Sequence, residues 1–245
     1  ASNVNVTGQS AKTTAQTAIS QTLTNLTNIN QDVVYTVIPT LNSCVGSSFK
    51  VTVTVKSKPT IPNQSISACN GNTISFGAIN SLPSTVVPPG TTYSWPTPPT
   101  LQPASVSLTN SKANTDTIMF LQTLYASSNV RATYSITPKA NGCTGSTFNL
   151  QITINAKPII NNQTINTCSK VGFSWTPTTG GGNTVPVGTT YTWSVSPNLN
   201  VAGQNDQPLA KTSIFDTLTN NSSTVQTVVY TVLPEVSTSP FCAGS

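Results

Sequence analysis

The sequence repeats itself with a period of 99 residues. Cys44, Cys143 and Cys242 follow one another at this interval, and Cys69 and Cys168 are also 99 residues apart. Each of the first three opens a Cys-x-Gly-Ser motif that follows a Tyr-x-x-x-Pro segment, and a Thr-Thr-Tyr-x-Trp segment and a Lys-Pro dipeptide each occur twice. A fixed period at this many positions indicates one folding unit copied head to tail. Function is therefore expected to belong to the array rather than to a single pocket.

Alignment of the copies divides the chain into three modules. Residues 58–156 contain one complete unit, which has the size of a self-supporting domain. Residues 1–57 match only the C-terminal part of that unit, because they contain no Trp-bearing strand. Residues 157–245 match a unit that lacks its final strand. We therefore expect the sequence to be a section of a longer array.

The complete unit has the pattern of short strands. Thr73–Phe76, Thr92–Trp95 and Thr147–Asn155 alternate polar and apolar side chains, so each is predicted to be a strand with one buried face. Proline-rich and Asn-Gly turns separate these segments. Six or seven such strands in a unit of this length predict an all-β fold, a β-sandwich, and no segment has helical periodicity.

Aromatic residues fall on the inward phase of the predicted strands. The expected core anchors are Trp95, Trp193, Tyr134 and Tyr230. Core packing is the simpler interpretation, since alternation places these side chains between the two sheets. The alternative is that the modules bind carbohydrate, which solvent exposure of Tyr93 or Tyr191 beside a groove would favour.

The composition argues against several classes of function. The chain has ten basic and five acidic residues among 245, and its basic residues are scattered. One arginine is too few for a phosphate-reading face, so we expect no nucleic-acid partner. No segment has the roughly 20 consecutive apolar residues of a membrane helix, so no membrane insertion is expected.

Catalytic and metal-binding residues are also scarce. There is no histidine, which removes the usual general base and any Ser-His-Asp triad. The acids are too dispersed for a calcium loop, and they are Asp32, Asp116, Asp206, Asp216 and Glu235. Without histidine or a Cys-x-x-Cys motif, the cysteines make a poor metal site. We predict no enzyme activity, no metal and no cofactor.

The cysteines are better explained as disulfides of an exported protein. One pairing of neighbours joins Cys44 to Cys69 and Cys143 to Cys168, and leaves Cys242 over. The other joins Cys69 to Cys143 and Cys168 to Cys242, so that Cys44 pairs outside the sequence. We favour the second pairing because each bridge stays inside one module. Sandwich topology opposes it, because it places the two cysteines of a module at opposite ends.

These motifs resemble a known family. The Gly-Thr-Thr-Tyr-x-Trp, Tyr-x-x-x-Pro with Cys-x-Gly-Ser, and Lys-Pro words are similar to the PKD-like, immunoglobulin-like repeats of very large Bacteroidota surface adhesins that serve gliding motility. The resemblance covers the whole chain. It implies export by type IX secretion and a cell-surface filament that adheres to a substratum. The implied partners are neighbouring repeats of the same chain, a surface or polysaccharide substratum, and the motility or secretion machinery.

The same resemblance suggests a modification. Asp116-Thr117-Ile118 and Asp216-Thr217-Leu218 match an Asp-Ser/Thr-apolar motif similar to the Bacteroidota O-glycosylation signal. Thr117 and Thr217 are the expected sites. The first copy has Gln21-Thr22-Leu23 at this place and lacks the acid, so Thr22 is expected not to be glycosylated. The alternative is that both threonines are ordinary strand residues.

Overall fold

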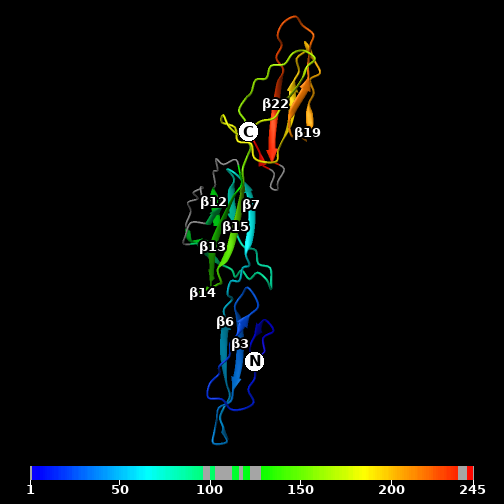
Figure 1. Cartoon of the computed structure of the whole chain (residues 1–245). Helices are drawn as coiled ribbons and strands as arrows, with labels where there is room; N and C mark the ends of the chain where they lie inside the picture. Colours follow the sequence, from blue (N-terminus) through cyan, green and yellow to red (C-terminus); the bar gives the residue numbers. More distant parts are fainter. Residues whose placement is uncertain are drawn as a thin grey trace.

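The structure is a computed structural model, which describes residues 2–95, 100–102, 112–115, 118–121, 128–236 and 242–244. Every regular element in these ranges is a β-strand, so the predicted all-β fold is confirmed. The strands form three groups that lie end to end in an elongated molecule (Figure 1). We call β1–β6 the first unit, β7–β15 the middle unit and β16–β23 the third unit.

The middle unit is a sandwich of two sheets. Its strands are β7 (Gln64–Cys69), β8 (Thr73–Phe76), β9 (Thr92–Trp95), β10 (Thr100–Gln102), β11 (Lys112–Thr115), β12 (Ile118–Leu121), β13 (Val130–Ala140), β14 (Cys143–Thr144) and β15 (Phe148–Asn155). One sheet has the order β11-β9-β13-β15-β7, and β10 and β14 also pair with β13. The other sheet pairs β8 with β12. Strand β7 runs parallel to β15, and the other pairings in this unit are antiparallel.

Side chains from both sheets fill one core. Along β13 every second residue is buried, as an inward-facing strand requires. Ile74 and Phe76 of β8 join Trp95, Tyr134 and Leu150 of the larger sheet in one buried cluster. The rings of Phe76 and Phe148 lie 6.1 Å apart across the two layers. The alternation predicted from the sequence therefore does specify the buried faces.

A proline lies inside the longest strand. Strand β13 continues through Pro138 to Ala140. The carbonyl oxygen of Pro138 accepts a hydrogen bond from the N–H of Gly145, at 2.8 Å, and this bond closes the hairpin to β14. A proline lacks a donor but keeps its acceptor, so it can lie in a strand where only the acceptor is used.

The first unit has fewer strands and a smaller core. Its strands are β1 (Val6–Thr7), β2 (Thr24–Asn25), β3 (Gln31–Val37), β4 (Thr40–Leu41), β5 (Cys44–Val45) and β6 (Phe49–Val55). Strand β3 pairs only with β6 among the described residues, and the buried core is limited to Val6, Val33 and Tyr35. The partly buried residues around this core include Val51, which β6 contributes.

The third unit repeats most of the middle unit. Its strands are β16 (Gly172–Trp175), β17 (Thr189–Ser196), β18 (Val201–Ala202), β19 (Gln207–Lys211), β20 (Ile214–Thr217), β21 (Thr219–Asn220), β22 (Val229–Val236) and β23 (Cys242–Ala243). Strand β16 pairs with β20 as β8 pairs with β12, and β17 pairs with β22 as β9 pairs with β13. The sequence contains no third copy of β15. Residues 163–168, which correspond to β7, form no strand.

Within the described ranges, no helix has the length and hydrophobicity needed to cross a bilayer.

Candidate functional site

The aromatic residues considered for carbohydrate binding lie inside the sandwiches. Tyr93 and Tyr191 are 2% and 1% exposed, and Trp95 and Trp193 are 1% and 5% exposed. The indole N–H of Trp193 donates to the backbone oxygen of Asn205 at 3.1 Å. Burial raises the pKa of the Tyr93 and Tyr191 hydroxyls. None of these four side chains presents an open face on which a sugar ring could stack.

Tyr134 and Tyr230 occupy equivalent positions but differ in environment. Tyr134 is 1% exposed, and burial raises its pKa to about 12. In the sheet, Tyr134 lies opposite Leu150 of β15. Tyr230 packs against the core of the third unit but remains partly exposed. The difference follows from the missing copy of β15, which would otherwise lie beside β22.

Asp216 is the centre of a polar cluster on β20. Its Oδ2 accepts hydrogen bonds from the Tyr230 hydroxyl and from the backbone N–H of Asn205, each at 3.0 Å. Its Oδ1 accepts from the Asn205 side chain at 3.1 Å and from the N–H of Thr217 at 3.0 Å. Burial first, and then the hydrogen bond and charge of Asp216, raise the pKa of Tyr230. The carboxylate thus has a structural role.

Gln21 holds the equivalent place in the first unit. The Tyr35 hydroxyl donates to its Oε1 at 2.6 Å, and Gln21 lies 14 residues before that tyrosine, as Asp216 lies 14 residues before Tyr230. An amide oxygen can accept the tyrosine's hydrogen bond as a carboxylate does, so the substitution keeps the local fold. What it removes is the negative charge beside the following threonine.

That following threonine is exposed in both units. Thr217 ends β20 with its side chain in solvent, and Thr22 is exposed as well. Gly203 and Gly8 lie against the backbone of these two residues, so the two threonines share this glycine contact. Opposite Thr217 in the sheet stands Gly172, which has no side chain to block the hydroxyl. Thr117 and Asp116 lie outside the described residues.

The described residues offer little for catalysis or ligand binding. No group of three or more His, Cys, Asp or Glu side chains among them is arranged to hold a metal ion. The carboxylates of Asp32 and Asp206 accept local hydrogen bonds from Thr54 and from the N–H of Val195. Two shallow hollows of about 210 and 300 Å³ lie beside Phe76 and Trp193. Both are at or below the lower end of the range for small-molecule pockets.

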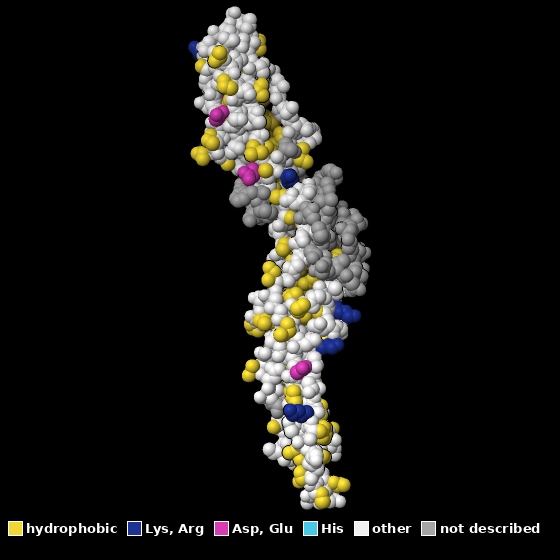
Figure 2. All heavy atoms as spheres, turned by 180° about the vertical axis from the view of Figure 1, so that it is seen from behind, with side chains coloured by type: hydrophobic (Ala, Val, Ile, Leu, Met, Phe, Trp, Pro, Cys, Tyr) yellow, Lys and Arg dark blue, Asp and Glu magenta, His cyan; other side chains and the backbone are white. Residues whose placement is uncertain are grey.

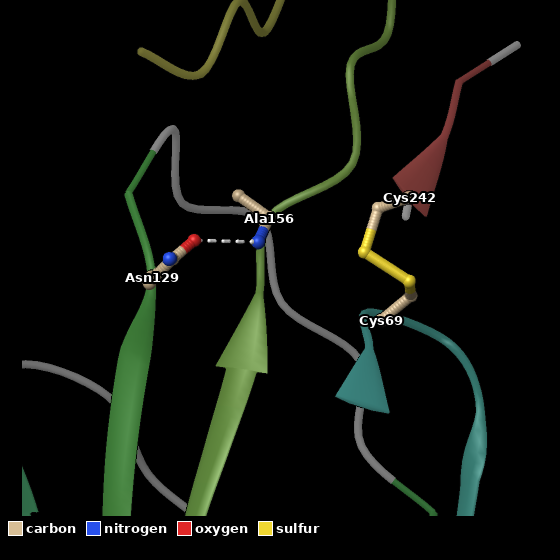
Figure 3. Close-up of a disulfide and its surroundings, with 4 residues drawn as sticks. All are labelled: Cys69, Asn129, Ala156 and Cys242. Atoms are coloured by element: carbon tan, nitrogen blue, oxygen red, sulfur yellow. Dashed lines mark hydrogen bonds between the residues drawn. A yellow bond between two sulfur atoms is a disulfide. The ribbon is translucent and has the colours of Figure 1, made fainter. Parts of the chain in front are cut away.

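The most distinctive feature lies at the junction of the middle and third units. A disulfide joins Cys69, the last residue of β7, to Cys242 in β23, and spans 173 residues of sequence (Figure 3). Neither pairing considered from the sequence occurs. Cys44, Cys143 and Cys168 are free thiols in this chain. The bridge therefore crosses the junction, whereas the favoured pairing kept each bridge inside a module.

The strand directions explain why the favoured pairing is wrong. Cys69 lies opposite Asn155, at the end of β15 that leads into the third unit. Cys143 lies in the hairpin at the other end of the middle unit, where a Cβ built on Gly142 would be 3.9 Å from Nζ of Lys56 in the first unit. The two thiols are separated by the length of the module, which no disulfide can span.

Beside each junction, an asparagine side chain accepts a hydrogen bond from the backbone just after the end of a strand. The N–H of Ala156 donates to the Asn129 side chain at 3.1 Å (Figure 3), and the N–H of Ser57 donates to Asn30 at 3.2 Å. Ser57 and Ala156 are fully buried. Asn30 and Asn129 are 99 residues apart, so the period of the sequence contains a signal for this contact.

In the middle and third units, the glycine of the Cys-x-Gly-Ser hairpin lies against the proline of the Lys-Pro linker. A Cβ at Gly145 would meet the carbonyl oxygen of Pro59, and one at Gly244 would meet that of Pro158. The backbone of each hairpin thus lies directly on the Lys-Pro linker that enters its unit. Only glycine allows such a close approach.

Tandem β-sandwich units of this kind define an immunoglobulin-like repeat protein. The family model of the PKD-like domain matches residues 1–59, 63–158 and 163–245. The chain therefore belongs to the PKD-like domain family. No curated protein matches it. Among solved structures, it is similar to the protocadherin GammaB4 extracellular domain, with 11% identity and a TM-score of 0.29, over 88% of this chain and 44% of that one. The chain thus spans less than half of that structure.

Proposed function

We propose that this chain is a non-enzymatic repeat segment of a long extracellular adhesin filament. The observation that carries the proposal is the end-to-end arrangement of three PKD-like units, with a disulfide across one junction (Figure 1). Such an arrangement holds a distal region away from its anchor without needing a pocket of its own. A structural disulfide also fits an oxidising compartment outside the cytoplasm.

The surface suits a spacer. In Figure 2 the charged side chains on the visible face are few and separated, with no continuous basic patch. A nucleic-acid partner would need such a patch. The buried aromatic residues likewise favour a spacer over a carbohydrate-binding module. In this proposal, the adhesive contacts belong to other regions of the filament.

The short repeated motifs of the sequence suggest a more specific role. They resemble repeats of the gliding-motility adhesin SprB, so we propose a cell-surface filament exported by type IX secretion and moved along the cell. Its partners would be the adjoining repeats, the motility or secretion machinery, and a surface or polysaccharide substratum. We propose modules at residues 1–57, 58–156 and 157–245 as the repeating units of this filament.

An antibody against the 245-residue chain tests this proposal in the source organism. It should label intact cells, and on an immunoblot it should detect a protein far larger than this chain. Fab fragments should slow surface attachment or gliding. Labelling only after permeabilisation would contradict the filament, and saturable binding of the isolated chain to a glycan array would favour carbohydrate binding instead.

A second function, strand-complemented self-assembly, is favoured by one observation. In the middle unit β15 lies between β13 and β7, whereas the third unit has neither a copy of β15 nor a strand at residues 163–168. The side chains of Val229 and Leu233 on β22 are about half exposed. In the filament, the repeat that follows in the same chain would supply this strand, whereas in a self-assembling subunit a strand donated by another chain would do so.

A synthetic peptide of residues 147–156 separates the two functions. If strands are exchanged between chains, the purified 245-residue chain should form concentration-dependent oligomers that the peptide dissolves. A chain that stays monomeric at all concentrations would support the filament segment. Sedimentation velocity measures both outcomes.

A further inference from the structure

All five cysteines fall on two structural positions. The first, the hairpin position, is held by Cys44, Cys143 and Cys242, each of which begins the short returning strand of a hairpin. In all three hairpins the glycine two residues later donates its N–H to the proline carbonyl of the Tyr-x-x-x-Pro motif, at 2.9, 2.8 and 2.8 Å. The three thiols therefore start from the same backbone geometry.

The second, the turn position, is held by Cys69 and Cys168. In both places the N–H three residues later donates to the cysteine carbonyl at 3.1 Å. In both, the residue two positions later has a positive φ, 83° at Gly71 and 63° at Lys170. The turn is thus conserved in shape between the middle and third units, although β7 before it has no counterpart strand.

The observed bridge links the two positions across a junction. Cys69 occupies the turn position of the middle unit, and Cys242 occupies the hairpin position of the third, 173 residues later. Applied to the free thiols, this spacing puts the partner of Cys168 beyond residue 245, and the partners of Cys143 and Cys44 before residue 1. The three cysteines that are free are the three whose partner position is not in this sequence.

We propose that Cys168, Cys143 and Cys44 are halves of further staples of the same kind, each completed by a cysteine in an adjoining copy of the repeat. In an array, every junction would then carry one disulfide from the turn position of one unit to the hairpin position of the next. Cys44 and Cys168 are exposed and Cys143 is partly exposed, so their thiols are accessible to a partner.

Formation of each staple requires an oxidant. Two thiols form one S–S bond and release two protons and two electrons. A disulfide of the thiol–disulfide oxidoreductase class, or oxidised glutathione in vitro, accepts them and leaves as two thiols. The reaction passes through a mixed disulfide, which the exposed thiols can form first.

Such staples would carry tension through the array. Cys44 and Cys69 are 25 residues apart, and half of that segment is already extended in β6 and β7. A fully stretched chain of this length reaches only about 80–90 Å. With a staple at each end, the load would run along these short segments and bypass the rest of each sandwich. The filament could then lengthen little before a disulfide breaks.

A lengthened chain tests the proposal, with the 245-residue chain followed directly by a second copy of residues 147–245. Ser245 corresponds to Ser146, so this join continues the period. After folding in a glutathione redox buffer, free thiols are alkylated and the unreduced protein is digested for mass spectrometry. We expect Cys69–Cys242 and, in addition, Cys168 bonded to the second copy's Cys242. Cys44, Cys143 and the second copy's Cys168 should be alkylated.

Matched variants distinguish a staple from chance oxidation. Cys168→Ser should release the second copy's Cys242 for alkylation and leave Cys69–Cys242 in place, whereas Cys143→Ser should change neither bond. Slow amide exchange in β13 and β15 shows that each variant has folded. The proposal is overturned if Cys168 bonds to Cys242 within its own unit, if it remains fully alkylated in the lengthened chain, or if it forms bonds only between chains.

Discussion

Thr217 and Thr22 differ in the residue that precedes them, and Thr217 ends a strand whereas Thr22 lies in none. Both threonines are exposed and lie against a glycine, but only Thr217 follows an acid. If the Asp-Thr-apolar motif directs O-glycosylation, protein from the native host should carry hexose-containing additions on Thr217 and Thr117, and none on Thr22. Peptide mass spectrometry measures this. Such a glycan would add hydrophilic bulk to a weakly charged surface and limit association between sheet edges.

An Asp216→Asn variant separates the motif from the fold. The amide oxygen can still accept the Tyr230 hydroxyl, as Gln21 accepts that of Tyr35, so the third unit should stay folded. Loss of the Thr217 addition in this variant would support recognition of the acid. An unmodified Thr217 peptide from the wild-type chain would contradict the glycosylation hypothesis.

Buried tyrosines make the fold sensitive to alkali. Burial raises the pKa of Tyr134 to about 12, above its ordinary value of 10.0, so the folded state holds this proton more tightly than the unfolded state. The resulting stabilisation is fully present below pH 10 and is lost as the pH rises toward 12. We expect Tyr134→Phe to reduce the loss of unfolding free energy over this window by roughly 1–2 kcal/mol. Urea unfolding at pH 8 and at several pH values above 10 measures the difference.

Tyr35→Phe is the matched control for this prediction. Tyr35 holds the same place in the first unit, but lies in its much smaller core. Its replacement should leave the alkaline unfolding of the middle unit unchanged. An equal effect of both substitutions would mean that Tyr134 is not a source of the pH dependence.

The glycine two residues after the hairpin position matters because the hairpin lies on the linker. A Cβ at Gly145 would meet the backbone of Pro59, whereas one at Gly46 would come no closer than 3.0 Å to the ring of Pro39. A proline ring can shift slightly, but the linker backbone is held by the bridge between Thr60 and Val86. Gly145→Ala should therefore destabilise the middle unit by about 1–3 kcal/mol, and Gly46→Ala by much less.

Thermal unfolding of the two glycine variants checks this difference. The junction should also loosen in Gly145→Ala, so amide exchange at Thr60 should become faster. Similar stability of both variants would show that the linker gives way easily, and the hairpin would then have no part in fixing the junction.

At the level of the strands, much of the fold could be predicted from the sequence. Alternation located β8 and β9 at their observed bounds and β15 to within one residue, because a strand with one buried face has a strict period of two. The absence of a strand at residues 163–168 could not be predicted from the sequence of that segment alone. This segment resembles β7, and only the partner strand β15 distinguishes the two, since a strand needs a neighbour for its hydrogen bonds.

The disulfide was missed for a related reason. Pairing each cysteine with its nearest neighbours along the sequence gives only spacings of 25 and 74 residues, and neither is the spacing of the observed pair. The observed spacing of 173 residues joins two cysteines that are not neighbours in the sequence, because Cys143 and Cys168 lie between them. The alternation of polar and apolar residues predicts which side chains are buried inside a sandwich. It does not predict the contacts at a junction, because these depend on which ends of two sandwiches meet.

For the whole molecule, the bridge changes how the chain responds to force. Units that touch only their neighbours are expected to unfold in separate events, each adding the length of one unit. Cys69–Cys242 alters this for a chain pulled by its two ends, because tension then passes from residue 69 directly to residue 242. In the oxidised chain, only the residues before Cys69 and after Cys242 can extend. The residues between the two cysteines bear no tension, so they do not add to the length of the pulled chain whether they stay folded or unfold.

Reduction should release that hidden length. Single-molecule pulling in a reducing buffer should add about 600 Å of contour length for the 173 residues between the two cysteines, in steps for the middle and third units. Cys242→Ser should show the same added length without reductant, while Cys168→Ser should behave as the oxidised wild type. If the oxidised wild-type chain already yields the full length, the bridge does not carry the load and the filament is extensible at its junctions.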